Sequence, residues 1–150
     1  MLQKRIPNFI SERPDDRQPS QITRQDSDYL LYPELTGMLR SILYEVHREL
    51  GSGFVHMHYR RAVQIELRWH NVPYDLKKEI IIHFRGQPIE TRKTRLLVID
   101  KKVLLTPIAV RQITPELITR FRQYLTILGL KIGLIANFHA PSLEIEIVRI

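Results

Sequence analysis

The sequence predicts an α/β domain in which helices flank a mixed β-sheet. Three features of the 150-residue chain support this expectation. Two segments in the N-terminal half repeat apolar residues every three or four positions, as amphipathic helices do. Short apolar runs bounded by Gly, Pro and Asp follow them, which is typical of β-strands. A third helical segment then separates these strands from two more.

Composition narrows the possible classes of protein. The chain has no Cys, which excludes disulfides, thiolate metal sites and cysteine nucleophiles. It contains no run of about 18 apolar residues, so no transmembrane helix is expected. Its first residues lack the long apolar stretch of a signal peptide. We therefore expect a cytoplasmic protein.

The chain divides into an arm, residues 1–32, and a body, residues 33–150. The arm is polar, shows no apolar period and contains equal numbers of basic and acidic residues, so we expect it to be extended. The whole net charge of +7 therefore lies in the body. A basic body suggests an anionic partner such as nucleic acid, although a merely soluble basic surface explains the charge equally well.

Two helices are expected before the strands. The first, residues 34–50, has apolar residues at helical spacing, an acidic residue at its start and Gly51 as its stop. The second, residues 54–70, places Val55, Tyr59 and Val63 on one face. It ends before Pro73, because the residue preceding a proline disfavours the helical conformation.

The stretch from Thr91 to Val110 is expected to form the centre of the sheet. It contains two apolar strands, Leu96–Ile99 and residues 103–110, joined by a polar turn at residues 100–102. An earlier strand, residues 74–84, leads into this stretch through the turn R-G-Q-P. Pro107 lacks the N–H that a sheet ladder uses, so the strand should be irregular or lie at an edge there.

The C-terminal third is expected to add one helix and two strands. Thr114 and Pro115 are the residue types favoured at a helix N-cap and first helical position, and Gly129 is a favoured stop. The nearly continuous apolar segment 131–138 predicts a central strand. The alternating segment 143–150 predicts a half-exposed strand.

Short motifs spread over three quarters of the chain follow the order of a known family. They are L-T-G at residues 35–37, V-H-R-E-L-G at 46–51, Gly53, Tyr59, I-T-P-E at 113–116, Y-L at 124–125, G-L-K-I-G-L-I at 129–135, N-F at 137–138 and P-S-L at 141–143. In these residues the chain resembles the bacterial GxxExxY family, which is assigned to the PD-(D/E)XK nuclease-like superfamily. The resemblance implies a restriction-endonuclease-like core in residues 33–150 and does not cover the arm.

The resemblance also implies a metal-dependent nuclease site. In such sites a strand Asp and a strand Glu hold Mg²⁺, a Lys two residues after the Glu activates water or steadies the transition state, and a helix Glu assists. This chain has other residues at each of these positions and at the family's Gln in the third helix: His56, Arg95, Thr106, Ile108 and Arg120.

A shift of register by one residue does not restore this site, because no acidic residue lies between Lys101 and Val110. An arginine at the position of the metal-binding Asp would also oppose a divalent cation by Coulomb repulsion. We therefore expect no catalytic residues, no metal and no other cofactor.

The histidines offer little alternative chemistry. His56 and His58 are expected on a helix, where their side chains point in different directions and make a poor metal pair. They are better explained as helix-surface residues. His47, within the motif V-H-R-E-L-G, is expected to satisfy a buried hydrogen bond.

The candidate contacts to nucleic acid are basic residues around the central hairpin and on the third helix. They are Arg85, Arg92, Lys93, Arg95, Lys101, Lys102, Arg111 and Arg120. A phosphate backbone would find several donors there. Because strand side chains alternate between faces, salt bridges to a protein partner, salt bridges within this chain and a solvated face remain open alternatives. No aromatic platform for stacking bases stands out, so base reading is not expected.

These observations favour a non-catalytic relative of the nucleases that serves as a binding or structural subunit of a larger protein or ribonucleoprotein assembly. It would be anchored by its arm and would contact a DNA or RNA backbone through its basic face. Two alternatives remain open. One is a scaffold subunit that binds protein only, and the other is an active Mg²⁺-dependent nuclease with relocated acidic residues.

Overall fold

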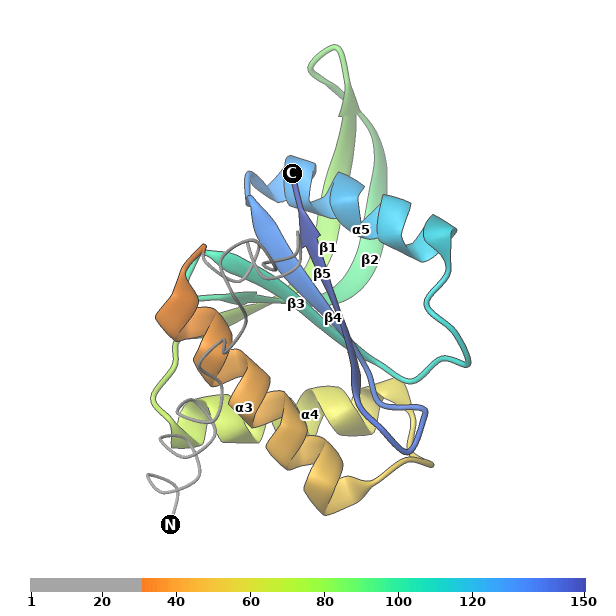
Figure 1. Ribbon diagram of the computed structural model, residues 1–150. Coiled ribbons are helices and arrows are strands. Elements are labelled where there is room, and N and C mark those ends of the chain that lie inside the picture. Colours follow the sequence, from red (N-terminus) through yellow and green to blue (C-terminus); the bar gives the residue numbers. More distant parts are fainter. Residues whose placement is uncertain (1–30) are drawn as a thin grey trace, which may run out of the picture.

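The computed structural model describes residues 31–150, so the predicted arm lies outside the described residues except for its last two. Leu31 and Tyr32 pack against the core. The described residues form a five-stranded sheet with two helices on one face and one helix on the other (Figure 1). None of the helices in this part of the chain is long and apolar enough to span a membrane.

The elements follow the order that the sequence predicts. They are α3 (Pro33–Leu50), α4 (His56–Trp69), β1 (Tyr74–Phe84), β2 (Gln87–Ile99), β3 (Val103–Ile108), α5 (Pro115–Leu128), β4 (Ile132–Asn137) and β5 (Glu144–Arg149). The strands lie in sequence order across the sheet. Only β3 and β4 are parallel, and α5 connects them. The predicted α/β class with a mixed sheet is confirmed.

Local sequence explains the boundaries of α5 and the central turn. Thr114 caps α5, since its Oγ1 accepts a hydrogen bond from the Leu117 N–H at 3.1 Å, and Gly129 ends the helix with a φ of 71°. In the turn between β2 and β3, Asp100 and Lys101 have φ values of 52° and 58°. Two positive φ values in succession give a turn whose twist matches that of the strands it joins.

The sheet has a separate apolar core on each face. On one face α3 and α4 pack through Leu39, Tyr59 and Val63 against strand residues such as Leu97 and Leu105. On the other face α5 packs through a smaller cluster, which includes Phe121, Leu125, Leu104, Ile108 and Ile135. Both clusters follow the alternation of side chains along β2, β3 and β4.

The structure accommodates Pro107 inside the central strand β3. The β2–β3 ladder covers only the pairs from Leu97↔Leu105 to Ile99↔Val103, so it ends before Pro107. Pro107 pairs only with Ala136 of β4. The side on which a backbone N–H is missing therefore faces no strand, and the predicted local edge is confirmed.

The small size of residue 133 allows α5 to lie close to the sheet. A Cβ atom on Gly133 would approach Phe121 Cε2 to 2.5 Å and the Leu104 carbonyl oxygen to 2.9 Å. Such distances require the neighbours to move. We expect Gly133→Ala to lower the free energy of unfolding by about 1–3 kcal/mol, as overpacking does in other cores, measured by urea denaturation.

Gly37→Ala is the matched control for this substitution. A Cβ at Gly37, within α3, meets no atom within 4 Å. Alanine is favoured over glycine in helices by about 1 kcal/mol, so this variant should be as stable as the parent or more stable. Equal stability of the two variants would contradict the close approach of α5 to β4.

Candidate nucleic-acid interface

The N-terminal end of α4 is fixed over the end of β3 by two aromatic residues. Tyr59 stacks on Phe138, with ring centroids 4.4 Å apart and planes 10° from parallel. The Tyr59 hydroxyl donates a hydrogen bond to the Gly51 carbonyl oxygen at 2.5 Å. The first contact joins α4 to the segment after β4, and the second joins it to the end of α3, so the first turn of α4 has a defined place beside the sheet.

We use the term corner for the region where the first turn of α4 meets the end of β3 and the segment after β4. Two further polar residues form hydrogen bonds with backbone groups there. The Asn137 side chain accepts a hydrogen bond from the Val110 N–H and donates one to the Val110 carbonyl oxygen, both at 2.9 Å. The predicted buried hydrogen bond of His47 is confirmed, since its Nε2 lies 2.9 Å from the Ala140 carbonyl oxygen. Tyr59, Asn137, Phe138 and His47 all belong to the motifs on which the resemblance described above depends.

His56 lies at the start of α4 and contacts β3 directly. Its Nδ1 accepts a hydrogen bond from the Ala109 N–H at 3.2 Å, which fixes the ring against the end of the strand. Partial burial lowers the pKa of His56, and repulsion from Arg60 lowers it further. His56 is exposed on the helix, as the sequence predicts, and its hydrogen bond also fixes the ring at the end of the strand.

Arg60 follows His56 by one helical turn and faces Arg95 of β2. Burial, then repulsion from Arg95 and Arg61, lowers the pKa of Arg60. The Nε atom of Arg60 is buried without a hydrogen-bond partner. Arg95 donates a hydrogen bond from Nη1 to the Thr94 carbonyl oxygen at 2.7 Å. Within residues 31–150 neither guanidinium forms a salt bridge with a carboxylate.

We call the two guanidinium groups of Arg60 and Arg95, together with the imidazole of His56 beside Arg60, the cationic cluster; its charge at neutral pH comes from the two arginines. It has one half-buried member, Arg60, and two exposed members, so it is open to solvent. A buried guanidinium N–H without an acceptor is unfavourable, and like charges placed together add to the cost. An anion that accepts hydrogen bonds from both arginines would relieve both penalties.

The structure does not place Thr106 and Ile108, which the resemblance assigns to the family's Glu and Lys, beside His56 of α4. Ile108 packs in the α5 cluster, and Thr106 pairs with Ile135 of that cluster. Both therefore lie on the face opposite α4. At this end of the sheet, the last β3 residue on the α4 face is Pro107, which pairs with Ala136, and Ala109 follows the strand. Neither has a side chain that can hold a metal or accept a proton.

The residues at this corner do not fit the magnesium ion that the family implies. Mg²⁺ prefers carboxylate oxygens, whereas the corner presents two guanidinium groups and an imidazole. No group of three or more His, Asp or Glu side chains within residues 31–150 is arranged to hold a metal ion.

The eight basic residues proposed from the sequence do not form one patch. At about 3.3 Å per residue, the ends of β2 are roughly 40 Å apart, and Arg85 and Lys101 lie just beyond opposite ends. Lys102 pairs with Asp100 at 3.2 Å in the same turn as Lys101. Arg111 is exposed in the segment after β3.

The remaining predicted cations are divided between the two faces of the sheet. Arg92 is bound to Glu90 at 3.2 Å and to the Tyr124 hydroxyl of α5, and these contacts raise its pKa. Arg120 is exposed on α5, and Lys93 is exposed opposite Glu79 of β1. Of the eight, only Arg95 joins the cationic cluster. Sequence reasoning missed Arg60, although its position four residues after His56 on a helix was a usable signal.

The fold agrees with the comparison to known protein families. A family model described as the PD-(D/E)XK nuclease superfamily matches residues 33–150. The chain belongs to this superfamily, and its sheet and flanking helices are consistent with the restriction-endonuclease-like fold. Searches of curated proteins and of solved structures found no match.

The contact between His56 and Arg60 predicts a measurable titration. His56 should titrate below its ordinary pKa of 6.5, because partial burial and Arg60 both disfavour the imidazolium. Arg60→Gln should raise the pKa of His56, while the effect of burial remains. NMR titration of the imidazole carbon-bound protons measures both values. An unchanged pKa in the variant would contradict the placement of Arg60.

The lowered pKa of His56 also makes the stability of the folded chain depend on pH. Above pH 6.5 His56 is largely neutral in both the folded and the unfolded chain. As the pH falls below 6.5, the unfolded chain binds the proton first, so the contribution of His56 to stability decreases. Arg60→Gln should reduce this acid-side loss.

Proposed function

We propose that this protein is a non-catalytic member of its superfamily that binds the phosphate backbone of nucleic acid. The observation that supports this most is the cationic cluster, in which His56 and Arg95 occupy two of the positions that the resemblance assigns to acidic residues. Arg60 and Arg95 together offer guanidinium donors without carboxylate partners in the described residues. Guanidinium groups bind phosphate through paired hydrogen bonds, and such contacts account for most non-specific affinity for nucleic acid.

Within the superfamily we assign the chain to the GxxExxY family. The segment from Gly53 to Tyr59 has the spacing of that motif, with His56 in place of the glutamate. In the structure Tyr59 is fully buried and His56 reaches the end of β3. This arrangement supports a role for the motif in positioning α4 that does not depend on the glutamate.

Binding to the backbone predicts a particular salt dependence. The double variant Arg60→Gln/Arg95→Gln should bind a DNA duplex more weakly than the parent. The slope of log affinity against log salt concentration should shrink by about 1 for each arginine lost. Fluorescence anisotropy with a labelled duplex over a salt series measures both quantities, and a single-stranded RNA probe tests the second class of backbone.

A charge-matched control separates the site from general electrostatics. Arg120→Gln/Lys131→Gln removes two exposed cations, one of them on α5 across the sheet from α4. This variant should change affinity and salt slope less than the site variant does. Equal losses in both variants, or weak binding by the parent that does not vary with salt, would contradict a phosphate site at the cationic cluster.

The absence of catalysis is tested separately. Supercoiled plasmid incubated with the protein and Mg²⁺ or Mn²⁺ should remain uncut, because no acidic residue faces α4 from β3. Cleavage that EDTA abolishes would overturn the proposal and favour the active nuclease with relocated acids. An enzyme of known activity, run in parallel, confirms that the assay conditions support cleavage.

One observation favours a protein partner as a second candidate function. The outer side of α4 exposes Met57, Ile65 and Trp69, with 37%, 55% and 63% of their surface accessible. These residues recur at multiples of four along the helix, so they form one apolar stripe. A stripe of this kind suits a scaffold subunit of a larger assembly.

A further inference from the structure

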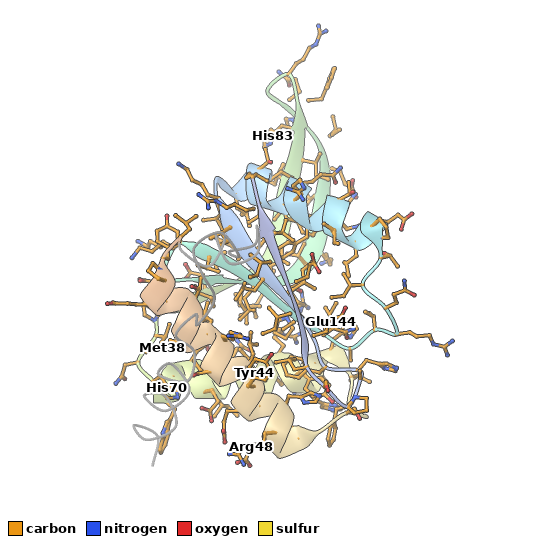
Figure 2. All side chains as sticks on the ribbon, viewed as in Figure 1. Met38, Tyr44, Arg48, His70, His83 and Glu144 are labelled. Carbon is orange, nitrogen blue, oxygen red and sulfur yellow. The ribbon has the colours of Figure 1, made fainter. Side chains whose placement is uncertain are left out.

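The β1–β2 hairpin extends beyond the rest of the sheet. β1 pairs with β2 from Ile99 back to Gln87, whereas β3 pairs only with Leu97–Ile99. The part nearest the Arg85–Gly86 turn therefore has no third strand beside it, and it projects from the body (Figure 1). Figure 2 shows His83 far out on this projection, beyond α5.

The free end of the hairpin exposes large apolar side chains. Phe84, Ile89 and Ile81 have 61%, 65% and 43% of their surface accessible. The guanidinium of Arg85 lies 5.3 Å from the centre of the Phe84 ring, so the tip combines an aromatic face with a cation. Apolar groups held away from the core have no role in folding that the described contacts explain, which suggests a partner.

The charge of the hairpin indicates an anionic partner. Residues 74–96 contain six Lys or Arg and three Asp or Glu. One of the acids, Glu90, is neutralised by Arg92. Lys78 and Arg85 are exposed and form no salt bridge within residues 31–150. A protein surface that matched only the apolar tip would gain nothing from these cations.

Double-stranded DNA suits both the apolar tip and the cations. Apolar side chains such as Phe and Ile enter the minor groove and insert between base pairs, while neighbouring cations contact the phosphates. The distance from Gln87 to Arg95 along β2 is roughly 26 Å at about 3.3 Å per residue. This is shorter than one turn of B-DNA, about 34 Å, so one duplex can contact both the tip and the cationic cluster.

We propose that Phe84 and Ile89 form a wedge that inserts into the base stack of double-stranded DNA and bends it, with Lys78 and Arg85 on the flanking phosphates. The proposal rests on the phosphate binding proposed above and adds the form of nucleic acid and the manner of contact. Insertion by such side chains typically kinks DNA by about 20–90°.

The test compares the full-length parent with Phe84→Ala/Ile89→Ala. The probe is a DNA duplex of about three helical turns with a fluorescence-transfer pair at its ends and a central 2-aminopurine. The parent should shorten the end-to-end distance and raise the 2-aminopurine fluorescence, which reports unstacking. The variant should lose both effects and keep the salt slope of the parent, because it loses no cation.

Ile127→Ala is the matched control, since Ile127 is 40% exposed on α5, away from the hairpin. It should bend the duplex as the parent does. If the parent binds with steep salt dependence but leaves the duplex straight and stacked, the wedge is wrong and the phosphate site stands. If the parent does not bind, both proposals fall.

Two further outcomes would also overturn the wedge. One is bending by the tip variant equal to that of the parent. The other is a dimer of the parent, seen by sedimentation without DNA, that the tip variant cannot form, because the apolar tip would then be an interface with a second copy. Both variants change exposed side chains only, so circular dichroism should show the parent fold.

Discussion

The stack of Tyr59 on Phe138 determines the position of α4 and therefore the position of Arg60 beside the sheet. The two rings come from α4 and from the residue after β4, and the contact is fully buried. His47 of α3 lies 5.8 Å from Phe138 on a second side, so three elements meet at one ring. Because α4 is a rigid body, fixing Tyr59 also fixes His56 and Arg60 on its neighbouring turns. The cationic cluster is thus a consequence of core packing.

The side chains that hold the fold together are different from those exposed at the corner. Tyr59, Asn137 and His47 position backbone and helices through contacts that need no metal and no acid. The residues at the open corner contribute little to that packing, so they can change charge without loss of the fold. The guanidinium groups of Arg60 and Arg95 at this corner favour an anion over a metal cation, which is the basis of the proposed phosphate site.

The sequence predicted the elements well because their signals are local. The cap at Thr114, the stop at Gly129 and the turn at Asp100–Lys101 each depend on a few neighbouring residues. The placement of charges was harder to predict because it depends on which strand face a residue occupies. Arg92 and Arg95 are three residues apart on β2, so strand alternation by itself places them on opposite faces. In the sequence they group together because both are close to the central hairpin, whereas in the structure Arg92 binds the Tyr124 hydroxyl of α5.

The hairpin and the cationic cluster meet at an irregularity in the β1–β2 pairing, where Thr94 and Arg95 lie opposite the segment from Lys77 to Glu79. Thr94 is buried there and donates a hydrogen bond from Oγ1 to the Lys77 carbonyl oxygen at 2.7 Å, which joins the two strands where β3 no longer pairs with β2. A two-stranded ribbon is marginally stable alone, so this contact and that of Arg92 with Tyr124 help to hold it on the body. These contacts fix the base of the projecting β1–β2 hairpin on the domain. A rigid projection with an apolar end is able to insert into a base stack, because little conformational entropy is lost when it binds.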